Sequence, residues 1–375
     1  MKIKNIIHPD EGKSDRVLLL LTSLLILIGL LMIASAGVFY SETRFADKYF
    51  FFKNQLFKGV LPGIIVLFIC QRINYRFWSR VAVPLFLITV SLLILVLIPS
   101  VGLKVYGASR WLSLGPLSFQ PSEMAKLSLI LYLAAWLGSK GKEKVSDLYE
   151  GFVPVFLVLI GVGILIMKQP DTGTLGVVTL TALAIYFASG AKLKHLVGLL
   201  GIGLVGLIFL VLVEPYRMDR LTAFRNHNAD PQGIGYQINQ ALVAIGSGGV
   251  FGLGLGHSRQ KFNYLPEPVG DSIFAIIGEE LGFLGSTVIA GLFLLFGLRG
   301  LRIAQRTPDP FGRFVVVGVT SWIVFQAFIN IAAITGLIPL TGIPLPFISY
   351  GGTSLLFLMA GVGIVLNISK YATER

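Results

Sequence analysis

Charged residues are scarce in this sequence: they make up 13% of its 375 residues, whereas 54% are hydrophobic. An ordinary soluble domain carries about 25% charged residues, so a water-soluble fold is excluded. Apolar runs of about 20 residues recur along the chain, and each is long enough to cross a hydrocarbon core of roughly 30 Å. The composition predicts an all-α polytopic membrane protein whose residues 1–375 form a single membrane domain.

Cysteine is nearly absent as well, since Cys70 is the only one and lies in an apolar run. An intramolecular disulfide is therefore excluded. Acidic residues are few, which leaves a net charge of +12. The basic residues are scattered over short loops rather than gathered on one face or tail, so we expect membrane lipids and no nucleic acid as partners.

Ten transmembrane helices are predicted from the apolar runs, with a large extracytoplasmic loop between spans 7 and 8. The first run is too long for the apolar region of a cleaved signal peptide, about 7–15 residues, so we expect it to be retained. The predicted spans are 17–40, 54–71, 79–99, 121–138, 152–168, 172–189, 195–213, 272–297, 312–335 and 345–369.

Orientation follows from the basic residues in the loops. With the N-terminus in the cytoplasm, the short inner segments hold 18 of the 31 basic residues. We therefore expect a cytoplasmic N-terminal tail (1–16), a cytoplasmic C-terminus (370–375) and an extracytoplasmic loop over residues 214–271.

The long outer loop contains features of its own. A structureless loop of that length in a compact protein is usually functional. The stretch GYQINQALVAIG (235–246) predicts a short amphipathic helix, and GSGGVFGLGLG (246–256) contains six glycines. No strand precedes these glycines and their spacing is not GxGxxG, so we expect close backbone packing or a re-entrant turn rather than a nucleotide site.

Ionisable groups at membrane depth are costly and tend to be functional and paired. Glu123 and Lys126 are three residues apart and share a helix face. They form a structural ion pair, or Lys126 faces a cavity and meets an anion. Asp171, in KQPDTGT, caps the following helix, pairs with Lys126 or Lys168, or does both.

Three more acids lie in DSIFAIIGEELGF (271–283). Asp271 is either a helix cap, in competition with Ser272, or a general base at the outer rim of a cavity. At most one of Glu279 and Glu280 can share the side that Asp271 faces. Arg110 and Trp111, in the 100–120 loop, fit an interfacial anchor or a substrate contact.

Several separated stretches together resemble the SEDS family, which includes FtsW, RodA and SpoVE. The resemblance covers about residues 15–369 and is strongest to FtsW. One departure is VGDSIF, where many members have a threonine before the aspartate. The stretches are GASRWLSLGPLSFQPSEMAKL (107–127), KQPDTGT (168–174), PYRMDRLTAF (215–224), GYQINQALVAIGSGG (235–249), GLGLGHSRQKFNYLPEP (252–268), DSIFAIIGEELGF (271–283) and PLPFISYGGTSL (344–355).

The resemblance implies a peptidoglycan glycosyltransferase in the bacterial cytoplasmic membrane. It would polymerise lipid II at the outer face, with a septal role in division, and undecaprenyl pyrophosphate would leave. Asp271 matches the proposed catalytic aspartate and would act as general base on the acceptor 4-hydroxyl. Expected partners are a class B penicillin-binding protein and other division proteins. Candidate substrate-binding residues are Arg110, Trp111, Lys126, Asp171, Arg217, Arg220, Arg259 and Glu279.

No metal-ligand cluster of recognisable spacing is present, so we expect no metal site built by the protein. A divalent cation (Mg²⁺ or Mn²⁺) would be shared with the substrate pyrophosphate. A flippase or transporter of lipid-linked precursors is the alternative, because buried charges and broken helices fit transport too. A non-catalytic scaffold for the cell-wall machinery is a third hypothesis.

Overall fold

The structure, a computed structural model, describes residues 12–99, 101–105, 108–114, 117–213, 215–226 and 233–372. It is almost entirely helical and contains one small sheet. Seven described helices are long and apolar enough to cross a membrane. They are Arg16–Ala36 (α1), Phe50–Arg72 (α3, the π-helical η2 and α4), Tyr75–Leu95 (α5), Leu148–Met167 (η3 and α8), Ile273–Arg306 (α13), Pro310–Ile334 (α14) and Gly352–Ser369 (α15).

The other three predicted spans also coincide with helices, namely Pro121–Gly138 (α6), Thr172–Ala188 (α9) and Leu193–Val213 (α10). The predicted division at 169–174 is confirmed, since α8 ends at Met167 and α9 begins at Thr172. Ten membrane crossings stay a prediction. Two short helices, Val38–Phe45 (α2) and Lys142–Val145 (α7), lie between the longer ones.

Two predicted boundaries are wrong. The eighth helix continues to Arg306, well past the predicted end at 297. The last helix begins only at Gly352, whereas the sequence predicted a start at 345. Proline cannot donate a backbone hydrogen bond, and Pro344 and Pro346 keep this stretch irregular. Residues 335–351 therefore form a non-helical segment between α14 and α15, called here the α14–α15 segment.

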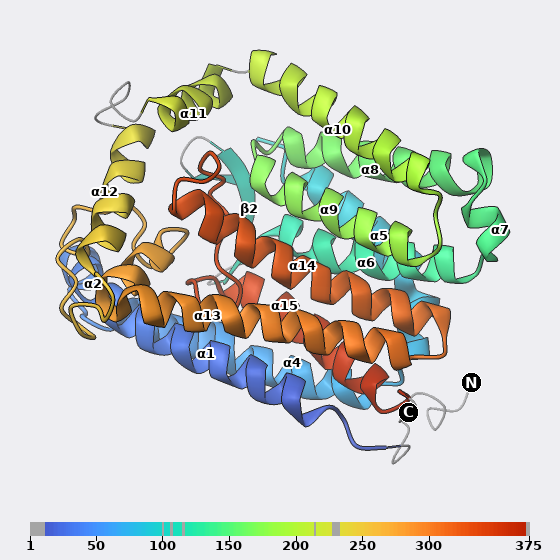
Figure 1. The fold of residues 1–375 in the computed structure, drawn as a ribbon, viewed down its shortest axis with the longest axis horizontal. Helices are drawn as coiled ribbons and strands as arrows, with labels where there is room; N and C mark the ends of the chain where they lie inside the picture. Colours follow the sequence, from blue (N-terminus) through green and yellow to red (C-terminus); the bar gives the residue numbers. More distant parts are fainter. Residues whose placement is uncertain are drawn as a thin grey trace.

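The long helices form one bundle (Figure 1). Helices α13 and α14 cross its middle, α1 lies against α13, and α14 contacts α6 and α9. Helix α10 lies at the edge of the bundle, and α2 and α12 lie at the end opposite α7. The amide of Asp15 donates to Ser369 Oγ at 2.9 Å, so α1 begins beside the end of α15.

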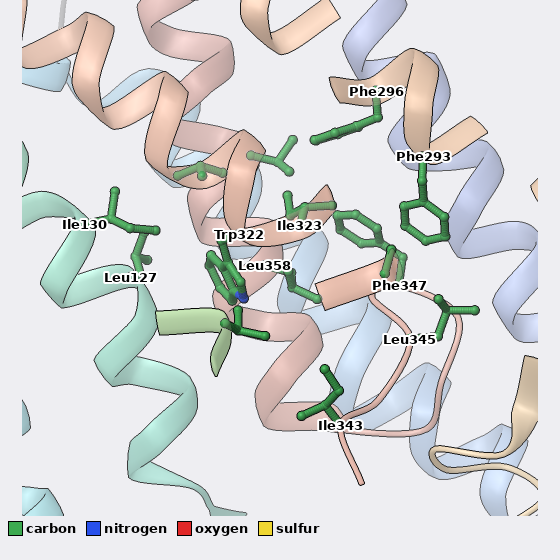
Figure 2. Packing of buried hydrophobic residues seen from close by; sticks show 14 of the residues in the cluster. Leu127, Ile130, Phe293, Phe296, Trp322, Ile323, Ile343, Leu345, Phe347 and Leu358 are labelled. Carbon is green, nitrogen blue, oxygen red and sulfur yellow. The ribbon is translucent and has the colours of Figure 1, made fainter. Parts of the chain in front are cut away.

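The core gathers around α14 and the α14–α15 segment (Figure 2). Trp322 and Ile323 of α14 are fully buried, and so are Phe293 and Phe296 of α13. The α14–α15 segment adds buried Ile343, Leu345 and Phe347, and α6 adds Leu127 and Ile130 (Figure 2). This irregular segment is thus part of the core rather than a surface loop.

The segments that the sequence places outside the membrane are more ordered than predicted. The expected helix at 235–246 is confirmed as α12 (Ile234–Ser247), but Pro215–Arg225 is also helical (α11). Three strands in the described parts of the 100–120 loop form an antiparallel sheet that was not predicted. Its strands are Gly102–Val105 (β1), Ala108–Leu114 (β2) and Leu117–Phe119 (β3), too short to give a clear alternating pattern.

Helix α13 is interrupted at Gly282, whose φ is 67° and ψ −167°. Here the carbonyls of Glu279 and Glu280 accept from the amides of Leu253 and Gly254 at 2.9 and 3.0 Å. The amides of Phe283 and Leu284 donate to the carbonyls of residues 249 and 250 at 2.9 and 3.1 Å. The glycine-rich segment 246–256 therefore replaces two hydrogen bonds of the helix with four of its own.

Close backbone packing of these glycines is confirmed. A Cβ on Gly248 would lie 1.9 Å from the carbonyl oxygen of Gly278, and one on Gly252 would lie 2.2 Å from that of Glu280. Only glycine allows the two backbones to approach so closely.

Candidate active site

Asp271 is the second-last residue before α13, and three consecutive carbonyls fix the backbone there. Tyr350 N donates to Val269 O at 2.8 Å, and Ser349 Oγ donates to Gly270 O at 2.7 Å. Asn330 Nδ2 donates to Asp271 O at 2.8 Å. The backbone of residues 269–271 is therefore fixed by α14 and the α14–α15 segment together.

The carboxyl group of Asp271 does not cap α13. The residue at the cap position is Ser272, and its side chain makes no capping hydrogen bond. Asp271 Oδ1 is buried, yet it has no hydrogen-bond partner among the described residues. A buried polar atom of this kind is costly, and such atoms are a mark of functional sites.

Arg220 of α11 borders the same place. A Cβ added at Gly342 would lie 3.9 Å from Asp271 Oδ2 and 4.0 Å from Arg220 Nη2, so both side chains face this glycine. Arg220 Nη1 donates to Leu340 O at 2.9 Å, which fixes the guanidinium over the α14–α15 segment. A carboxylate and a cation thus lie beside the same glycine, whose φ of 70° disfavours any side chain.

The environment of Asp271 alters its acidity. Burial, followed by the nearby Glu267 carboxylate, raises the pKa of Asp271 to about 6. Arg220 and Gln237 act in the opposite direction but do not cancel the shift. A carboxyl group with this pKa is ionised at neutral pH and retains more basicity than an ordinary aspartate.

The two glutamates of α13 lie away from Asp271. Glu279 accepts hydrogen bonds from Ser258 Oγ and from the amides of Arg259 and Gln260, the latter two at 2.9 and 3.3 Å. Glu280 accepts from Lys261 Nζ at 3.0 Å and from Ser35 Oγ at 2.7 Å. Both are buried, and both hold the 258–261 loop against the bundle. A substrate contact by Glu279 stays a prediction.

Lys126 lies in the core, 4% exposed. Its Nζ is 2.8 Å from Glu123 Oε1 and 2.9 Å from Gln326 Oε1. It also lies 5.1 Å from the centroid of the Trp322 ring. Of the two interpretations left open by the sequence, these contacts match the structural ion pair.

Asp171 and Arg110 meet at the turn between α8 and α9. Asp171 Oδ1 accepts from the amide of Thr174 at 3.1 Å and so caps α9. Arg110 Nε donates to Gln169 O at 2.8 Å, and its Nη2 donates to Pro170 O. Trp111 follows on β2, opposite Leu103. This group stabilises the KQPDTGT turn, and substrate contacts by its members stay predictions.

The other two predicted cations, Arg217 and Arg259, make contacts with other parts of the chain. Arg217 of α11 is 6% exposed, with Nη2 4.0 Å from the Met167 sulfur. Arg259 is exposed on the loop held by Glu279. Of the predicted residues, the structure therefore brings only Arg220 next to Asp271. Within the described ranges, no three His, Cys, Asp or Glu side chains lie close enough together to hold a metal ion.

Sequence reasoning missed the polar residues that support Asp271. Gln326 and Asn330 lie four residues apart in an apolar span, so they share one helix face. Their signal in the sequence is an uncharged polar side chain inside an apolar span.

Comparison with known proteins assigns almost the whole chain to one family. The family model described as Cell cycle protein, which covers FtsW, RodA and SpoVE, matches residues 15–374. Stage V sporulation protein E of Bacillus subtilis (strain 168) is 46% identical over 359 residues, which cover 96% of this chain and 97% of that protein. The probable peptidoglycan glycosyltransferase FtsW of Geobacter sp. (strain M18) is 41% identical, covering 95% of this chain and 96% of that protein.

Solved structures agree in fold. RodA, the rod shape determining protein of Thermus thermophilus, matches with a TM-score of 0.71 at 28% identity, over 96% of this chain and 98% of RodA. A structure described as "Structural coordination of polymerization and crosslinking by a peptidoglycan synthase complex" matches with a TM-score of 0.79 at 28% identity, over 95% of this chain and 97% of that chain. The chain is thus a multi-pass membrane protein that belongs to the FtsW, RodA and SpoVE (SEDS) family and is FtsW-like.

Proposed function

We propose that this protein is a peptidoglycan glycosyltransferase that polymerises lipid II at the outer face of the bacterial cytoplasmic membrane. The observation that carries the proposal is the buried Oδ1 of Asp271, which has no hydrogen-bond partner in the described part of the chain, with Arg220 facing the same glycine as Asp271. The names of its FtsW relatives support the activity. Septal synthesis in cell division is the role we propose, since several relatives that match almost the whole chain are named FtsW.

The reaction joins two lipid-anchored disaccharides. The 4-hydroxyl of the acceptor attacks the anomeric carbon of the donor, and undecaprenyl pyrophosphate leaves. An alcohol is a poor nucleophile until its proton is removed, and a positioned carboxylate can remove it. The pKa of Asp271, raised to about 6, leaves the group ionised at pH 7 and matched to this task. Asp271 is therefore the proposed general base.

The leaving pyrophosphate gains negative charge as the bond breaks, so it needs fixed positive charge nearby. Arg220 is the cation that the geometry favours, because it borders the same glycine as Asp271. A divalent cation, Mg²⁺ or Mn²⁺, would supply further charge neutralisation. Its ligands would come mainly from the pyrophosphate, since the described residues contain no cluster of three metal-binding side chains.

A class B penicillin-binding protein is the proposed partner, because one structural neighbour is described as a complex that coordinates polymerisation and crosslinking. We further propose that both termini are cytoplasmic.

The flippase alternative requires a midplane site between two gates. Asp271, Lys126 and Asp171 make separate side-chain contacts, so no convergence on such a site supports transport, and the names of the FtsW relatives favour the enzyme.

Lipid II polymerisation by the purified protein, assayed with its cognate transpeptidase, tests the proposal. The comparison is between wild type, Asp271→Asn and the matched control Asp309→Asn. Asp309 also precedes a long helix, where it caps α14 through the amide of Gly312 at 2.9 Å. We expect glycan strands from wild type and the control, and a loss of about 10²–10⁴-fold in Asp271→Asn.

Each other outcome removes part of the proposal. Full activity in Asp271→Asn would retain the polymerase and reject Asp271 as its base. No strands from the wild type, in an assay where a known polymerase works on the same lipid, would reject the polymerase.

A further inference from the structure

One face of α14 carries polar side chains toward the candidate site. Trp322, Gln326 and Asn330 follow one another at four-residue spacing and are all buried. Helix α14 otherwise packs apolar side chains into the core (Figure 2). Buried polar groups in a span are expensive unless their hydrogen bonds are satisfied, so their partners show what they hold in place.

Asn330 joins two separate segments with one amide group. Its Nδ2 donates to Asp271 O and to Ile343 O, both at 2.8 Å. Both partners are carbonyl oxygens, which only accept, so the orientation of the amide is determined by the hydrogen bonds. The side chain is 1% exposed, and its Oδ1 has no partner within the described part of the chain.

Gln326 extends this contact one turn along the helix. Its Nε2 donates to Pro344 O at 2.9 Å, next to the carbonyl that Asn330 holds. Its Oε1 accepts from Lys126 Nζ and from Trp322 Nε1, each at 2.9 Å. The carbonyls of residues 343 and 344 are thus tied through α14 to the buried Glu123–Lys126 pair.

Gly342 immediately precedes these two carbonyls, and Asp271 and Arg220 both face it. The direction of the Asp271 carboxyl group depends on the backbone angles of Asp271, and its distance from Gly342 depends on where residues 342–344 lie. Asn330 fixes both at once, because its two hydrogen bonds end on Asp271 and on Ile343.

We propose that Asn330 is a positioning residue for Asp271, joining the backbone of the general base to the α14–α15 segment, with Gln326 as its support. This inference rests on the proposed function. A displacement of about 1 Å in a reacting group can lower a rate about 10²-fold. Loss of the two Asn330 hydrogen bonds should therefore reduce kcat by about 10–100-fold and leave KM for lipid II within about twofold.

Asn367 of α15 provides a matched control. It is also a buried asparagine, 2% exposed, that joins two backbone segments. Its Nδ2 donates to Gln71 O at 2.8 Å, and its Oδ1 accepts from the amide of Tyr75 at 2.9 Å. It lies two residues before the end of α15, far along the helix from the α14–α15 segment.

The experiment measures lipid II polymerisation rates and melting temperatures for wild type, Asn330→Ala, Asn367→Ala, Asp271→Asn and the double variant Asp271→Asn/Asn330→Ala. We expect both asparagine variants to melt lower than wild type and only Asn330→Ala to lose kcat. Because Asn330 acts through Asp271, the double variant should be no slower than Asp271→Asn alone.

Two outcomes would overturn the proposal: equal kcat losses in the two asparagine variants, or a double variant slower than Asp271→Asn by the full factor seen for Asn330→Ala. If Asn330→Ala does not fold, Asn330→Ser keeps a donor but shortens its reach and carries the same expectation. Failure of the proposed function is separate, since it would appear as no glycan strands from the wild type, whereas full activity in Asp271→Asn would reject Asp271 as the base.

Discussion

Helices α14 and α10 are both apolar and of similar length, 25 and 21 residues, yet they differ in their position in the bundle and in the burial of their side chains. Helix α14 crosses the middle of the bundle and buries Gln326 and Asn330 (Figure 1). Helix α10 lies at the edge, where Leu193, Val205 and Leu212 are exposed.

Hydrophobicity alone therefore does not separate a helix at the edge of the bundle from one that supports a site. Helix α10 also buries a polar side chain, His195 in its first turn. The distinguishing feature of α14 is that its buried polar groups bond to Asp271 and to the α14–α15 segment.

Glycines of α13 and α10 also differ in how closely neighbouring atoms pack against them. A Cβ on Gly300 of α13 would lie 2.1 Å from Thr320 Oγ1 of α14. Cβ atoms added at Gly201, Gly203 and Gly206 of α10 would meet no described atom within 4 Å. At Gly300 the backbone of α13 is thus closely packed against a side chain of α14, whereas these three glycines of α10 are open.

The largest effect on stability is expected at the buried Lys261–Glu280 pair, which joins the 258–261 loop to α13. Lys261→Met leaves the Glu280 carboxylate buried without its cation, 3.0 Å away in the wild type. Breaking such a pair costs about 3–5 kcal/mol of unfolding free energy. Thermal unfolding in detergent measures the loss, and Lys261→Met/Glu280→Gln, which also removes the charge, should recover part of it. Equal melting of Lys261→Met and wild type would contradict this expectation.

A smaller loss is expected where the glycine-rich segment contacts α13. Gly248→Ala places a Cβ 1.9 Å from the carbonyl oxygen of Gly278, so one backbone must move. Overpacking of this kind costs about 1–3 kcal/mol. The control is Gly246→Ala, two residues earlier, whose Cβ would meet no described atom within 4 Å. If both variants melted alike, the close contact would carry no stability.

The acidity of Asp271 gives a third expectation. A general base must be ionised, and the pKa of Asp271 is raised to about 6. Polymerisation rate should therefore fall about tenfold per pH unit below 6 and level off above pH 7. A pH–rate profile of kcat/KM measures this limb, and Asp309→Asn should keep it. A limb near the ordinary value of 3.8 would place Asp271 in a solvated environment instead.

The raised pKa of Asp271 also predicts how stability depends on pH, and this dependence is opposite in sign to that of the polymerisation rate. The folded-state pKa of Asp271 lies above the ordinary value, so its contribution to stability is present below about pH 4 and is lost as pH rises through about 6. At pH 7.5, Asp271→Asn should therefore melt no lower than wild type while being nearly inactive. Melting curves at pH 5 and pH 7.5 test the sign.

The smallest effect is expected at the open glycines of α10. Gly203→Ala in α10 removes backbone freedom without a clash and should stabilise the helix by about 0.5–1 kcal/mol. Gly300→Ala in α13 makes the same chemical change but meets Thr320, so it should destabilise. Differential melting of this pair measures the contrast directly. A loss in both variants would mean that α10 packs more closely than its exposure indicates.

Sequence reasoning predicted the helical bundle because apolar runs of spanning length dominate the chain. It also predicted the α8–α9 division, helix α12 and the packing of the glycines. It did not predict the start of α15, because the run beginning at 345 is apolar even though Pro344 precedes it and Pro346 lies within it, and these prolines disfavour a helix there. It identified Asp271 and Arg220 separately, but their approach depends on Gly342, far away in sequence. The roles of Asn330 and Gln326 depend on tertiary contacts with carbonyl groups, which no side-chain pattern reveals.

The break in α13 has a consequence for biosynthesis. While α13 is alone in a bilayer, the carbonyls of residues 279 and 280 have no partners other than the amides of its own next turn, and an unpaired group there costs several kcal/mol. We therefore expect a newly inserted α13 to be a continuous helix. The interruption at Gly282 should form only when the glycine-rich segment packs against α13 and replaces those hydrogen bonds. The final shape of this helix would then be acquired after membrane insertion, through a segment that precedes it in the chain.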